Sequence, residues 1–397
     1  MNRIALIAGT YLPERCSVAD YTAHLCTNLR QNKIESVVLT TYYAAEAAYD
    51  PNAIGVVHGW RLTDMRALVQ AVRATKADLL HIQYSASSYG SDAILLLPLL
   101  LRLTKWRSPI VTTVHDYGWW DSQKIYPQLF AWLNWGQKRH LWDGENGFFL
   151  TLSDAIIATN THVGTLIHNR LPKLKNRVFH IPVAANVEVA AIERKRARQI
   201  LRENCNWSND SVVIAFFGFL KPGQGLEILI PAFKQVLASQ PQARLLVIGG
   251  VENLALSSEE SKRYLLQLQI LTAELELLQL VHFTDYISAQ TTSHYLTGAD
   301  IGVLPCDRGV NLGSSSLLTL LAHSLPVVAT QGQISLPAGH PIQLIPPRDV
   351  VALTAMLLEL INNQDKRMQL GAASRSLGQS FTWQNVVKGH LAVYDSL

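Results

Sequence analysis

The sequence predicts an α/β protein with two domains, each built on a parallel β-sheet covered by helices. Three observations predict this: the chain has 397 residues, 48% of them are hydrophobic, and short apolar runs alternate with amphipathic stretches. This length exceeds one ordinary hydrophobic core and indicates two or three domains. Alternating apolar runs and helical patterns are typical of β-α-β units. Because the alternation begins a second time near Val212, we expect two consecutive Rossmann-like sheets.

The first half of the chain supplies the elements of the first sheet. Helices are expected at Tyr21–Asn32 and near Asp64–Ala74. The segment Ala93–Trp106 is strongly apolar, but Pro98 and Arg102 interrupt it, and it falls short of the roughly 20 residues that span a bilayer. We interpret it as a buried or surface-lying helix. The expected strands are Ile4–Ala8, Ser36–Thr40, Leu79–Gln83, Ile110–His115, Ala155–Ala158 and Val178–Ile181.

The character of the sequence changes around Val183–Val187, and the charged stretch Glu193–Glu203 follows. We interpret its basic residues as the solvated face of a helix at a domain join, with an anion-binding patch as the less favoured alternative. This places one domain at residues 1–184 and a second at 185–379. The second sheet is expected to contain strands Val212–Gly218, Arg244–Gly249, Val281–Thr284, Ile301–Leu304 and Val327–Thr330, with helices near Gly225–Ser239, Glu259–Leu278, Thr291–Gly298, Ser314–Ser324 and Val350–Asn362.

Composition excludes several classes of protein. The net charge of +4 permits an anionic ligand or loose contact with an acidic membrane surface, but it is too small for a nucleic-acid footprint. The N-terminal apolar run is short for a signal peptide, and we interpret it as the first strand. We expect a cytoplasmic protein, with peripheral contact at the inner face of the membrane left open, as is the oligomeric state. Four scattered cysteines without C-x-x-C spacing disfavour a disulfide framework or a zinc site: Cys16, Cys26, Cys205 and Cys306.

The first strand-to-helix turn of the second sheet, Phe216–Glu227, is a candidate phosphate-binding turn. Gly218 ends the strand, Lys221 offers a positive charge, and Gly223 and Gly225 open the next helix. Backbone N–H groups at a helix N-terminus, aided by the helix dipole, suit a phosphate. The spacing matches neither G-x-G-x-x-G nor a P-loop, which argues against a dinucleotide dehydrogenase and an ATPase. An ordinary glycine turn is the alternative.

The second turn, within Leu304–Thr330, indicates phosphate binding more strongly. A polar loop there meets a helix that is opened by Gly313, Ser314, Ser315 and Ser316. One capping residue is enough for a helix start. Four small residues in a row therefore leave several N–H groups uncovered, which is the arrangement that a diphosphate needs.

Both turns resemble the donor-binding end of the family 4 glycosyltransferases, which have the GT-B fold. The resemblance covers nearly the whole chain, with the matching segments in the family's order. It implies two Rossmann-like domains that face each other across a cleft, with the acceptor side in residues 1–184, completed by a returning helix at 380–397, and the nucleotide sugar held by 185–379. The matching segments are Asp78–Tyr84, Val111–Asp116, Asp154–Thr159, Ile181–Asn186, Phe216–Ala232, Phe283–Pro305, Thr319–Thr330 and Phe381–Tyr394.

The resemblance also implies which residues contact the nucleotide sugar. Two glutamates, eight positions apart, are usual in the donor loop of the family, and Asn311 and Thr319 stand in their places here. The implied contacts come from both turns and from the strand end between them. They are Gly218, Lys221, Gln224, Tyr286, Ile287, Asp307, Arg308, Asn311, Leu312, Gly313, Ser314, Ser315, Ser316 and Thr319.

A second departure concerns the positive charge of the donor site. The basic pair that is usual in the first turn falls on Phe219 and Gln224. Lys221 and Arg308 are candidate replacements for the lost cations. The diphosphate would therefore rest mainly on backbone N–H groups and hydroxyls, which should weaken donor binding without preventing it.

On the acceptor side, the resemblance implies that His115 lies near the transferred sugar. A lone histidine at a strand end would by default have a packing or solubility role, but the adjacent Asp116 and the order of the segments favour a catalytic one. Asp20 is predicted as an acceptor contact or a base, with an N-cap role as an equal alternative. Five tryptophans of Tyr117–Phe149 could stack on sugars or form a packed helical hairpin: Trp119, Trp120, Trp132, Trp135 and Trp142.

The predicted activity is transfer of a hexose from a nucleoside diphosphate sugar to a saccharide or lipid-linked acceptor, in polysaccharide or glycolipid synthesis. UDP-glucose or a similar UDP-hexose is the first choice, because such donors are common in the family. The family implies a retaining reaction without a metal or bound cofactor, and the sequence has no D-x-D-like cluster. The departures in the donor loop support a second hypothesis, a catalytically degenerate member that binds sugars or takes part in a complex.

Overall fold

The computed structural model describes the chain apart from residues 1, 15, 119–129, 252–257 and 335. The chain forms two compact units. Unit 1 contains Met1–Val183 and Trp383–Leu397, and unit 2 contains Ala184–Thr382. The predicted boundary after residue 184 and the predicted returning helix at 380–397 lie close to these limits. The roles assigned to the two domains stay predictions.

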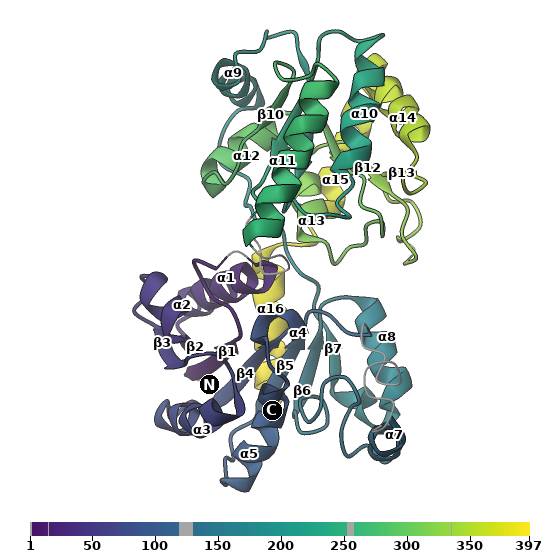
Figure 1. Ribbon diagram of the computed structural model, residues 1–397. Helices are drawn as coiled ribbons and strands as arrows, with labels where there is room; N and C mark the ends of the chain where they lie inside the picture. Colours follow the sequence, from purple (N-terminus) through teal and green to yellow (C-terminus); the bar gives the residue numbers. More distant parts are fainter. Residues whose placement is uncertain (1, 15, 119–129, 252–257, 335) are drawn as a thin grey trace. The chain divides into compact units, whose positions relative to one another are not determined.

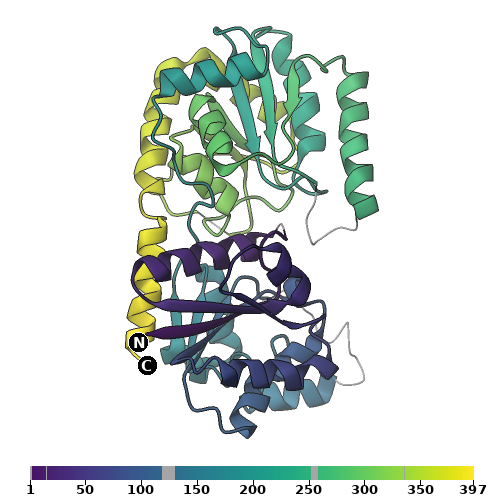
Figure 2. The ribbon, with the colours of Figure 1, turned by 90° about the vertical axis from the view of Figure 1, so that its left-hand side faces the viewer.

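Unit 1 is built on a seven-stranded parallel sheet with the strand order β3-β2-β1-β4-β5-β6-β7. Helices cover both faces of this sheet (Figures 1 and 2), so its central strands are buried, and in β4 the burial includes the polar side chains of His81 and Gln83. The strand order reverses between β1 and β4, the point at which sheets of this kind bind ligands beyond the carboxyl ends of the strands. The strands are β1 (Arg3–Ala8), β2 (Glu35–Thr41), β3 (Ala53–Val57), β4 (Leu79–Tyr84), β5 (Ile110–Val114), β6 (Ala155–Ala158) and β7 (Val178–His180).

The apolar segment near Ala93 forms the short 3₁₀ helix η2 (Asp92–Leu96) and α5, in which Leu97 and Leu101 are buried and Leu103 is exposed. None of the helices within the described residues has the length and apolar character needed to cross a membrane. The helices of unit 1 are α1 (Ser17–Gln31), α2 (Tyr42–Ala47), α3 (Met65–Ala74), α4 (Ala86–Tyr89), α5 (Leu97–Leu103), α7 (Phe130–Lys138), α8 (Thr161–Arg170) and α16 (Trp383–Asp395).

Helix α16, yellow in Figure 1, joins unit 1 from the far end of the sequence and packs against α1. Its contacts are polar as well as apolar. The Tyr21 hydroxyl lies 3.3 Å from His390 Nε2, and the Tyr394 hydroxyl lies 2.6 Å from Nδ1 of His81 on β4. All four side chains are buried, so α16 is part of the core of unit 1.

Unit 2 is built on a six-stranded parallel sheet with the order β10-β9-β8-β11-β12-β13. Helices again cover both faces (Figure 2). The strands are β8 (Val212–Phe217), β9 (Ala243–Ile248), β10 (Val281–Phe283), β11 (Ile301–Leu304), β12 (Val327–Thr330) and β13 (Gln343–Ile345). The helices are α9 (Arg194–Asn204), α10 (Leu226–Leu237), α11 (Ser258–Glu274), α12 (Ala289–Gly298), α13 (Ser315–Ala322), α14 (Val350–Asn362) and α15 (Gln364–Gly378).

The interpretation of α9 as a solvated helix face is wrong for one of its arginines. Arg202 is 1% exposed, and its guanidinium lies 2.9 Å from Asp300 Oδ2. It also donates to the carbonyl oxygens of Ser211 and Gly298, at 2.5 and 3.0 Å. A buried charge needs this number of partners, because burial removes the water that would otherwise solvate it.

Candidate functional site

The structure of unit 2 brings the two predicted turns together at the carboxyl ends of β8 and β11. A Cβ on Gly225, whose φ is +80°, would lie 1.9 Å from the Pro305 carbonyl oxygen, so only glycine permits this approach of the two backbones. The Asp307 N–H donates to the Gly223 carbonyl at 3.0 Å. A Cβ on Gly218 would lie 3.2 Å from Ser316 Oγ. Both turns therefore contribute to one surface.

The start of α13 presents open backbone donors at this surface. Ser314 is the N-cap, and its hydroxyl accepts from the Leu317 N–H at 3.3 Å. Asn311 occupies two further donors, because its side-chain oxygen accepts from the Gly313 N–H at 2.7 Å and its carbonyl from the Ser314 N–H at 3.0 Å.

Fewer N–H groups are therefore open than the four small residues suggest. Within the described residues, the N–H groups of Ser315 and Ser316 have no acceptor. Both residues are partly exposed. The first turn of a helix carries a partial positive charge, so these two donors suit an anionic group.

An aromatic pair lies beyond the carboxyl ends of β8 and β10. Tyr286, after β10, and Phe219, after β8, are partly exposed, with ring centroids 6.3 Å apart. A Cβ on Gly250 would lie 2.2 Å from the Tyr286 ring, so the glycine makes room for the tyrosine. Ile287 is also partly exposed beside Tyr286. These side chains form an apolar border to the polar surface.

The charged groups of this surface differ from those predicted. Asp307 forms an ion pair with Arg348 at 2.5 Å, and this hydrogen bond lowers the pKa of the Asp307 carboxyl. Arg348 was not among the predicted site residues, because it follows β13 far along the chain. Lys221 is partly exposed and makes no ion pair within the described part of the chain. Arg308 is exposed.

The remaining predicted donor contacts are less accessible or already engaged. Thr319 is fully buried inside α13, so its predicted contact with the nucleotide is not supported by this geometry. Its hydroxyl oxygen is buried and has no hydrogen-bond partner within the described residues. The side-chain oxygen of Gln224 accepts a hydrogen bond from Cys306 Sγ at 3.4 Å. Leu312 is partly exposed in the loop.

In unit 1, His115 directly follows β5 and its ring is held from two sides. Nε2 lies 2.8 Å from the side-chain oxygen of Gln83, and because that oxygen can only accept, Nε2 carries the proton. The Tyr21 ring meets the His115 ring edge-on, with centroids 4.8 Å apart. Desolvation, together with a smaller effect of His390, lowers the pKa of His115 to about 3. The ring is therefore neutral at pH 7, with Nδ1 as its acceptor.

Asp116 and Asp20 have different surroundings from His115. The Asp116 carboxylate accepts from the Ser85 hydroxyl at 2.7 Å and from the Ala86 N–H at 3.4 Å, so it fixes the start of α4. Burial raises its pKa. Asp20 lies in the first turn of α1, whose N-cap is Cys16, so the N-cap alternative is wrong. At that position its charge complements the helix dipole.

The tryptophans that the structure describes pack against one another. Trp132 and Trp142 have ring centroids 4.4 Å apart, and Trp135 lies 6.1 Å from Trp142. This favours a packed helical segment over a sugar-stacking platform, although Trp132 and Trp135 stay 57% and 45% exposed. Trp119 and Trp120 lie outside the described residues.

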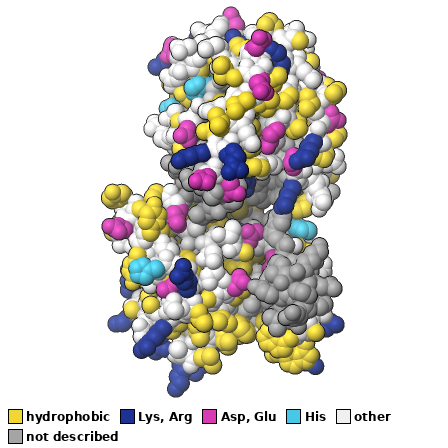
Figure 3. Space-filling view, in the orientation of Figure 1, with side chains coloured by type: hydrophobic (Ala, Val, Ile, Leu, Met, Phe, Trp, Pro, Cys, Tyr) yellow, Lys and Arg dark blue, Asp and Glu magenta, His cyan; other side chains and the backbone are white. Residues whose placement is uncertain are grey.

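Charge is mixed over the surface that Figure 3 shows, where Lys and Arg side chains are interspersed with Asp and Glu. Over the described ranges, three or more His, Cys, Asp or Glu side chains nowhere gather into a group that could hold a metal ion.

Two family models match this chain. The one described as Glycosyltransferase Family 4 matches residues 18–189, and the one described as Glycosyl transferases group 1 matches residues 211–363. A GDP-mannose-dependent monoacylated alpha-(1-6)-phosphatidylinositol monomannoside mannosyltransferase from Corynebacterium glutamicum is 28% identical over 219 residues, which are 52% of this chain and 52% of that protein. The chain thus spans about half the length of the curated relatives it matches.

Solved structures resemble the whole chain. Sucrose-phosphate synthase from Thermosynechococcus elongatus has a TM-score of 0.73 at 18% identity, covering 100% of this chain and 99% of that one. Anabaena HepE in complex with UDP and glucose has a TM-score of 0.69 at 14% identity, with both chains covered completely. Such likeness shows the fold. Since one family model matches each unit and the two together match most of the sequence, the chain belongs to the family 4 glycosyltransferases and has their GT-B fold.

Proposed function

We propose that this protein transfers a hexose from a nucleoside diphosphate sugar to a saccharide or lipid-linked acceptor. The observation that carries the proposal is the open pair of N–H groups at Ser315 and Ser316, next to the glycine turn that ends β8. A diphosphate accepts hydrogen bonds from such donors and is stabilised by the helix dipole. Lys221 adds a positive charge from the facing turn.

The same groups supply the electrostatic part of the reaction. When the bond between the sugar and the diphosphate breaks, negative charge grows on the leaving phosphate. Fixed N–H donors and a cation at that position stabilise the transition state more than the ground state. His115, held neutral with the proton on Nε2, offers Nδ1 as an acceptor for a sugar hydroxyl. We propose that the reaction retains the anomeric configuration, as the family resemblance implies.

The donor is best identified by a screen of nucleotide sugars for thermal stabilisation. A ligand that binds only the folded protein raises the free energy of unfolding by RT ln(1 + [L]/Kd). Our first choice is UDP-glucose, and the Anabaena structure contains UDP and glucose. The relative from Corynebacterium glutamicum is named for GDP-mannose, so GDP-mannose is the second donor to test. The proposed donor class is wrong if no nucleoside diphosphate sugar raises the unfolding temperature.

We propose further that the reaction needs no metal ion. The support is the lack, within the described residues, of a carboxylate or histidine group suited to one. Activity measured after EDTA treatment and buffer exchange should equal untreated activity. A complete loss that Mn²⁺ restores would contradict this.

A non-catalytic role has support of its own. Asn311 and Thr319 replace the two donor-loop glutamates usual in the family, and Asn311 is bound to the loop backbone while Thr319 is buried. A degenerate member would bind a nucleotide sugar without transferring it or hydrolysing it. The donor screen followed by a product assay separates these outcomes, because both roles predict stabilisation and only the enzyme releases the free nucleoside diphosphate.

A further inference from the structure

A cavity lies at the amino ends of the unit 2 strands, opposite the strand ends that form the proposed donor surface. It has a volume of about 620 Å³. Its wall includes Val212 at the start of β8, Asp300 just before β11 and Pro326 just before β12, with α9 and α15 at its sides. The donor surface lies beyond the other ends of β8 and β11, about 17 Å away along a six-residue strand.

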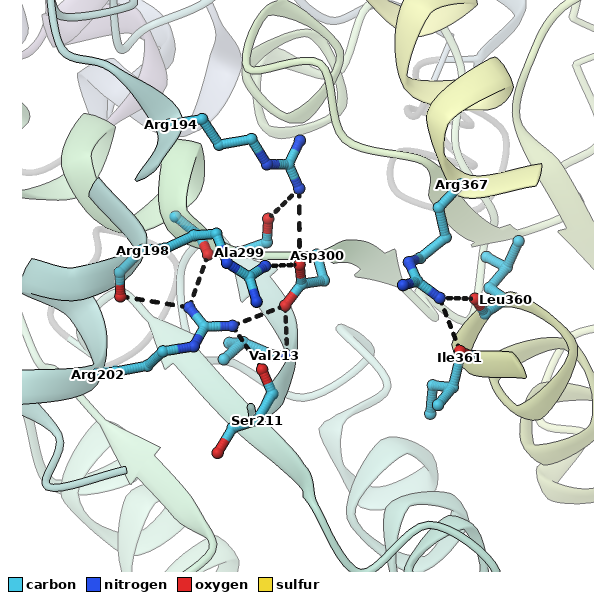
Figure 4. Close-up of polar contacts among 11 residues, drawn as sticks. Arg194, Arg198, Arg202, Ser211, Val213, Ala299, Asp300, Leu360, Ile361 and Arg367 are labelled. Atoms are coloured by element: carbon cyan, nitrogen blue, oxygen red, sulfur yellow. Dashed lines mark hydrogen bonds and ion pairs between the residues drawn. The ribbon is translucent and has the colours of Figure 1, made fainter. Parts of the chain in front are cut away.

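Three arginines of α9 converge on Asp300 at one side of this cavity (Figure 4). Arg202 and the Val213 N–H both bind Oδ2, each at 2.9 Å. Arg198 binds Oδ1. Arg194 lies 3.6 Å from Oδ1 and donates to the Ala299 carbonyl at 3.0 Å.

A fourth arginine reaches the cavity from α15. Arg367 donates from one guanidinium nitrogen to the carbonyl oxygens of Leu360 and Ile361, at 2.5 and 2.7 Å (Figure 4). Both carbonyls belong to the last turn of α14. Within the described residues Arg367 has no carboxylate partner at ion-pair distance.

Positive charge therefore exceeds negative charge at this cavity. Asp300 is the ion-pair partner of Arg194, Arg198 and Arg202, so one carboxylate faces three guanidinium groups of α9, and Arg367 adds a fourth positive charge. Desolvation lowers the pKa of Arg367, and although Asp300 opposes this, Arg198 and Arg194 lower it further. The same causes lower the pKa of Arg202. An anion bound between α9 and α15 would relieve this repulsion.

A structural role, the attachment of α9 to the sheet, explains only two of the four arginines. Arg202 and Arg198 attach the helix through their ion pairs with Asp300. Arg194, whose side chain is 49% exposed, and Arg367 add charge at the rim that the attachment does not need. The rest of the wall is small or apolar, with Pro326, Met368, Gly371 and Ala372, and it offers Gln364 as a hydrogen-bonding group.

We propose that this cavity binds a phosphate group, carried by a small molecule or by a lipid headgroup, between Arg194 and Arg198 on α9 and Arg367 on α15. Guanidinium groups donate paired hydrogen bonds to phosphate oxygens and keep their charge when partly buried. The volume lies within the range of about 300–1,000 Å³ that is usual for small-molecule sites. The site is separate from the donor surface, so its occupant is a second ligand.

The test uses the full chain and inorganic phosphate or pyrophosphate as the probe. The unfolding temperature should rise with probe concentration by more than it does in sodium chloride of equal ionic strength. The double variant Arg194→Gln/Arg367→Gln should weaken the apparent affinity by about tenfold or more, since two charge-assisted contacts are lost. A response no greater than that of sodium chloride overturns the proposal.

A control for the Arg194 substitution removes one positive charge from the same helix. Arg196 is on α9, is exposed, and donates to Gln199 at 2.9 Å, and it is not part of the cavity wall. Arg196→Gln should leave the phosphate response unchanged. Equal losses in Arg196→Gln and in the single variant Arg194→Gln would show a diffuse effect of net charge and overturn the site. If the Arg367 substitution prevents folding, because Arg367 also binds the end of α14, Arg194→Gln alone carries the test.

The donor surface also attracts phosphate, so a second variant separates the two sites. Ser315→Asp should abolish nucleotide binding and retain the response that depends on Arg194 and Arg367. If Ser315→Asp removes the entire phosphate response, the cavity does not bind phosphate. If only the donor proposal is wrong, Arg194→Gln/Arg367→Gln should still weaken the phosphate response. Ser315→Asp should then leave both phosphate binding and nucleotide binding unchanged.

The source of the phosphate is tested by co-sedimentation with phosphatidylcholine vesicles that contain phosphatidylglycerol. Sedimentation that falls in the double variant and persists in Arg196→Gln assigns a lipid headgroup. Stabilisation by soluble phosphate without sedimentation assigns a small molecule. Absence of both contradicts the inference.

Discussion

The two candidate sites, one in each unit, are built in different ways. In unit 1, His115 is held by the side chains of Gln83 and Tyr21, and these belong to a buried network that continues to His390 on α16. In unit 2, the anion-binding groups are backbone N–H groups at Ser315 and Ser316. A site made of side chains is vulnerable to substitutions around it. A site made of backbone tolerates the loss of family side chains, provided that the helix start keeps its shape.

The largest expected effect is at the backbone site. Ser315→Asp should lower the affinity for UDP or GDP by about 100-fold or more, because a carboxylate would compete with the diphosphate for the helix start. The fold should persist, since an acidic residue is favourable in the first turn of a helix. Isothermal titration measures the change, and Ser315→Ala is the control that removes only the hydroxyl. Unchanged affinity in Ser315→Asp would refute the donor assignment.

His115→Ala should produce the opposite pattern. Turnover should fall by about 10²-fold, the usual scale for a positioned catalytic group. Affinity for free nucleotide should change little, because its proposed contacts are all in unit 2. Steady-state kinetics and nucleotide titration of the same preparation test both parts. Near-normal turnover would make the histidine a structural residue and leave the donor site unaffected.

The free energy of unfolding should depend on pH through His390, which belongs to the buried network of unit 1. Desolvation lowers the pKa of His390 to about 4, from an ordinary value near 6.5. Between these values the unfolded chain binds more protons than the folded one, so acid favours unfolding. His390 should therefore cost about 2 kcal/mol of stability between pH 7 and pH 5.

The comparison is made with His390→Gln, which keeps hydrogen-bonding capacity without titrating. Urea unfolding of both proteins at pH 7 and pH 5 measures the difference in their pH dependence. Parallel curves for the two proteins would show that His390 does not titrate as its burial indicates.

Gln83→Leu should have the smallest effect, about a tenfold fall in kcat with little change in the KM for the donor. The leucine cannot accept the Nε2 proton of His115, so the ring loses its preferred orientation and tautomer. Gln83→Glu restores an acceptor and should recover part of kcat while shifting the pH profile, because a carboxylate raises the pKa of a neighbouring histidine. A rise in KM with constant kcat would argue against this positioning role.

The fold could be predicted wherever local pattern and packing agree. The strands β6, β11 and β12 and the helix α14 begin and end where the apolar runs place them. The strands β3 and β13 were missed because they are short edge strands. Helix α15 was missed because its sequence is polar and contains two glycines. Its helical state depends on close packing, since a Cβ on Gly371 would lie 2.5 Å from the Ser324 carbonyl oxygen.

The site residues could be predicted only where they lie close together in the sequence. Gly218, Gly225 and Ser315 lie at strand-to-helix turns that the sequence displays directly. Gln83 reaches His115 from a neighbouring strand, and Arg348 reaches Asp307 from a distant loop. Such pairs depend on tertiary structure, and nothing in a single sequence connects them. The burial of Arg202 has the same origin, because its partner Asp300 is 98 residues away.

The membership of α16 in unit 1 has a consequence for synthesis on the ribosome. Domains tend to fold as soon as their residues emerge, in order from the N-terminus. Unit 1 cannot follow that order to its end, because His81 and Tyr21 receive their partners Tyr394 and His390 only after the whole of unit 2 has been translated. Until then Tyr21 and His81, which are buried in the folded protein, lack these two hydrogen-bond partners. A nascent chain that ends just before Trp383 would therefore contain a complete unit 2 and an unfinished unit 1.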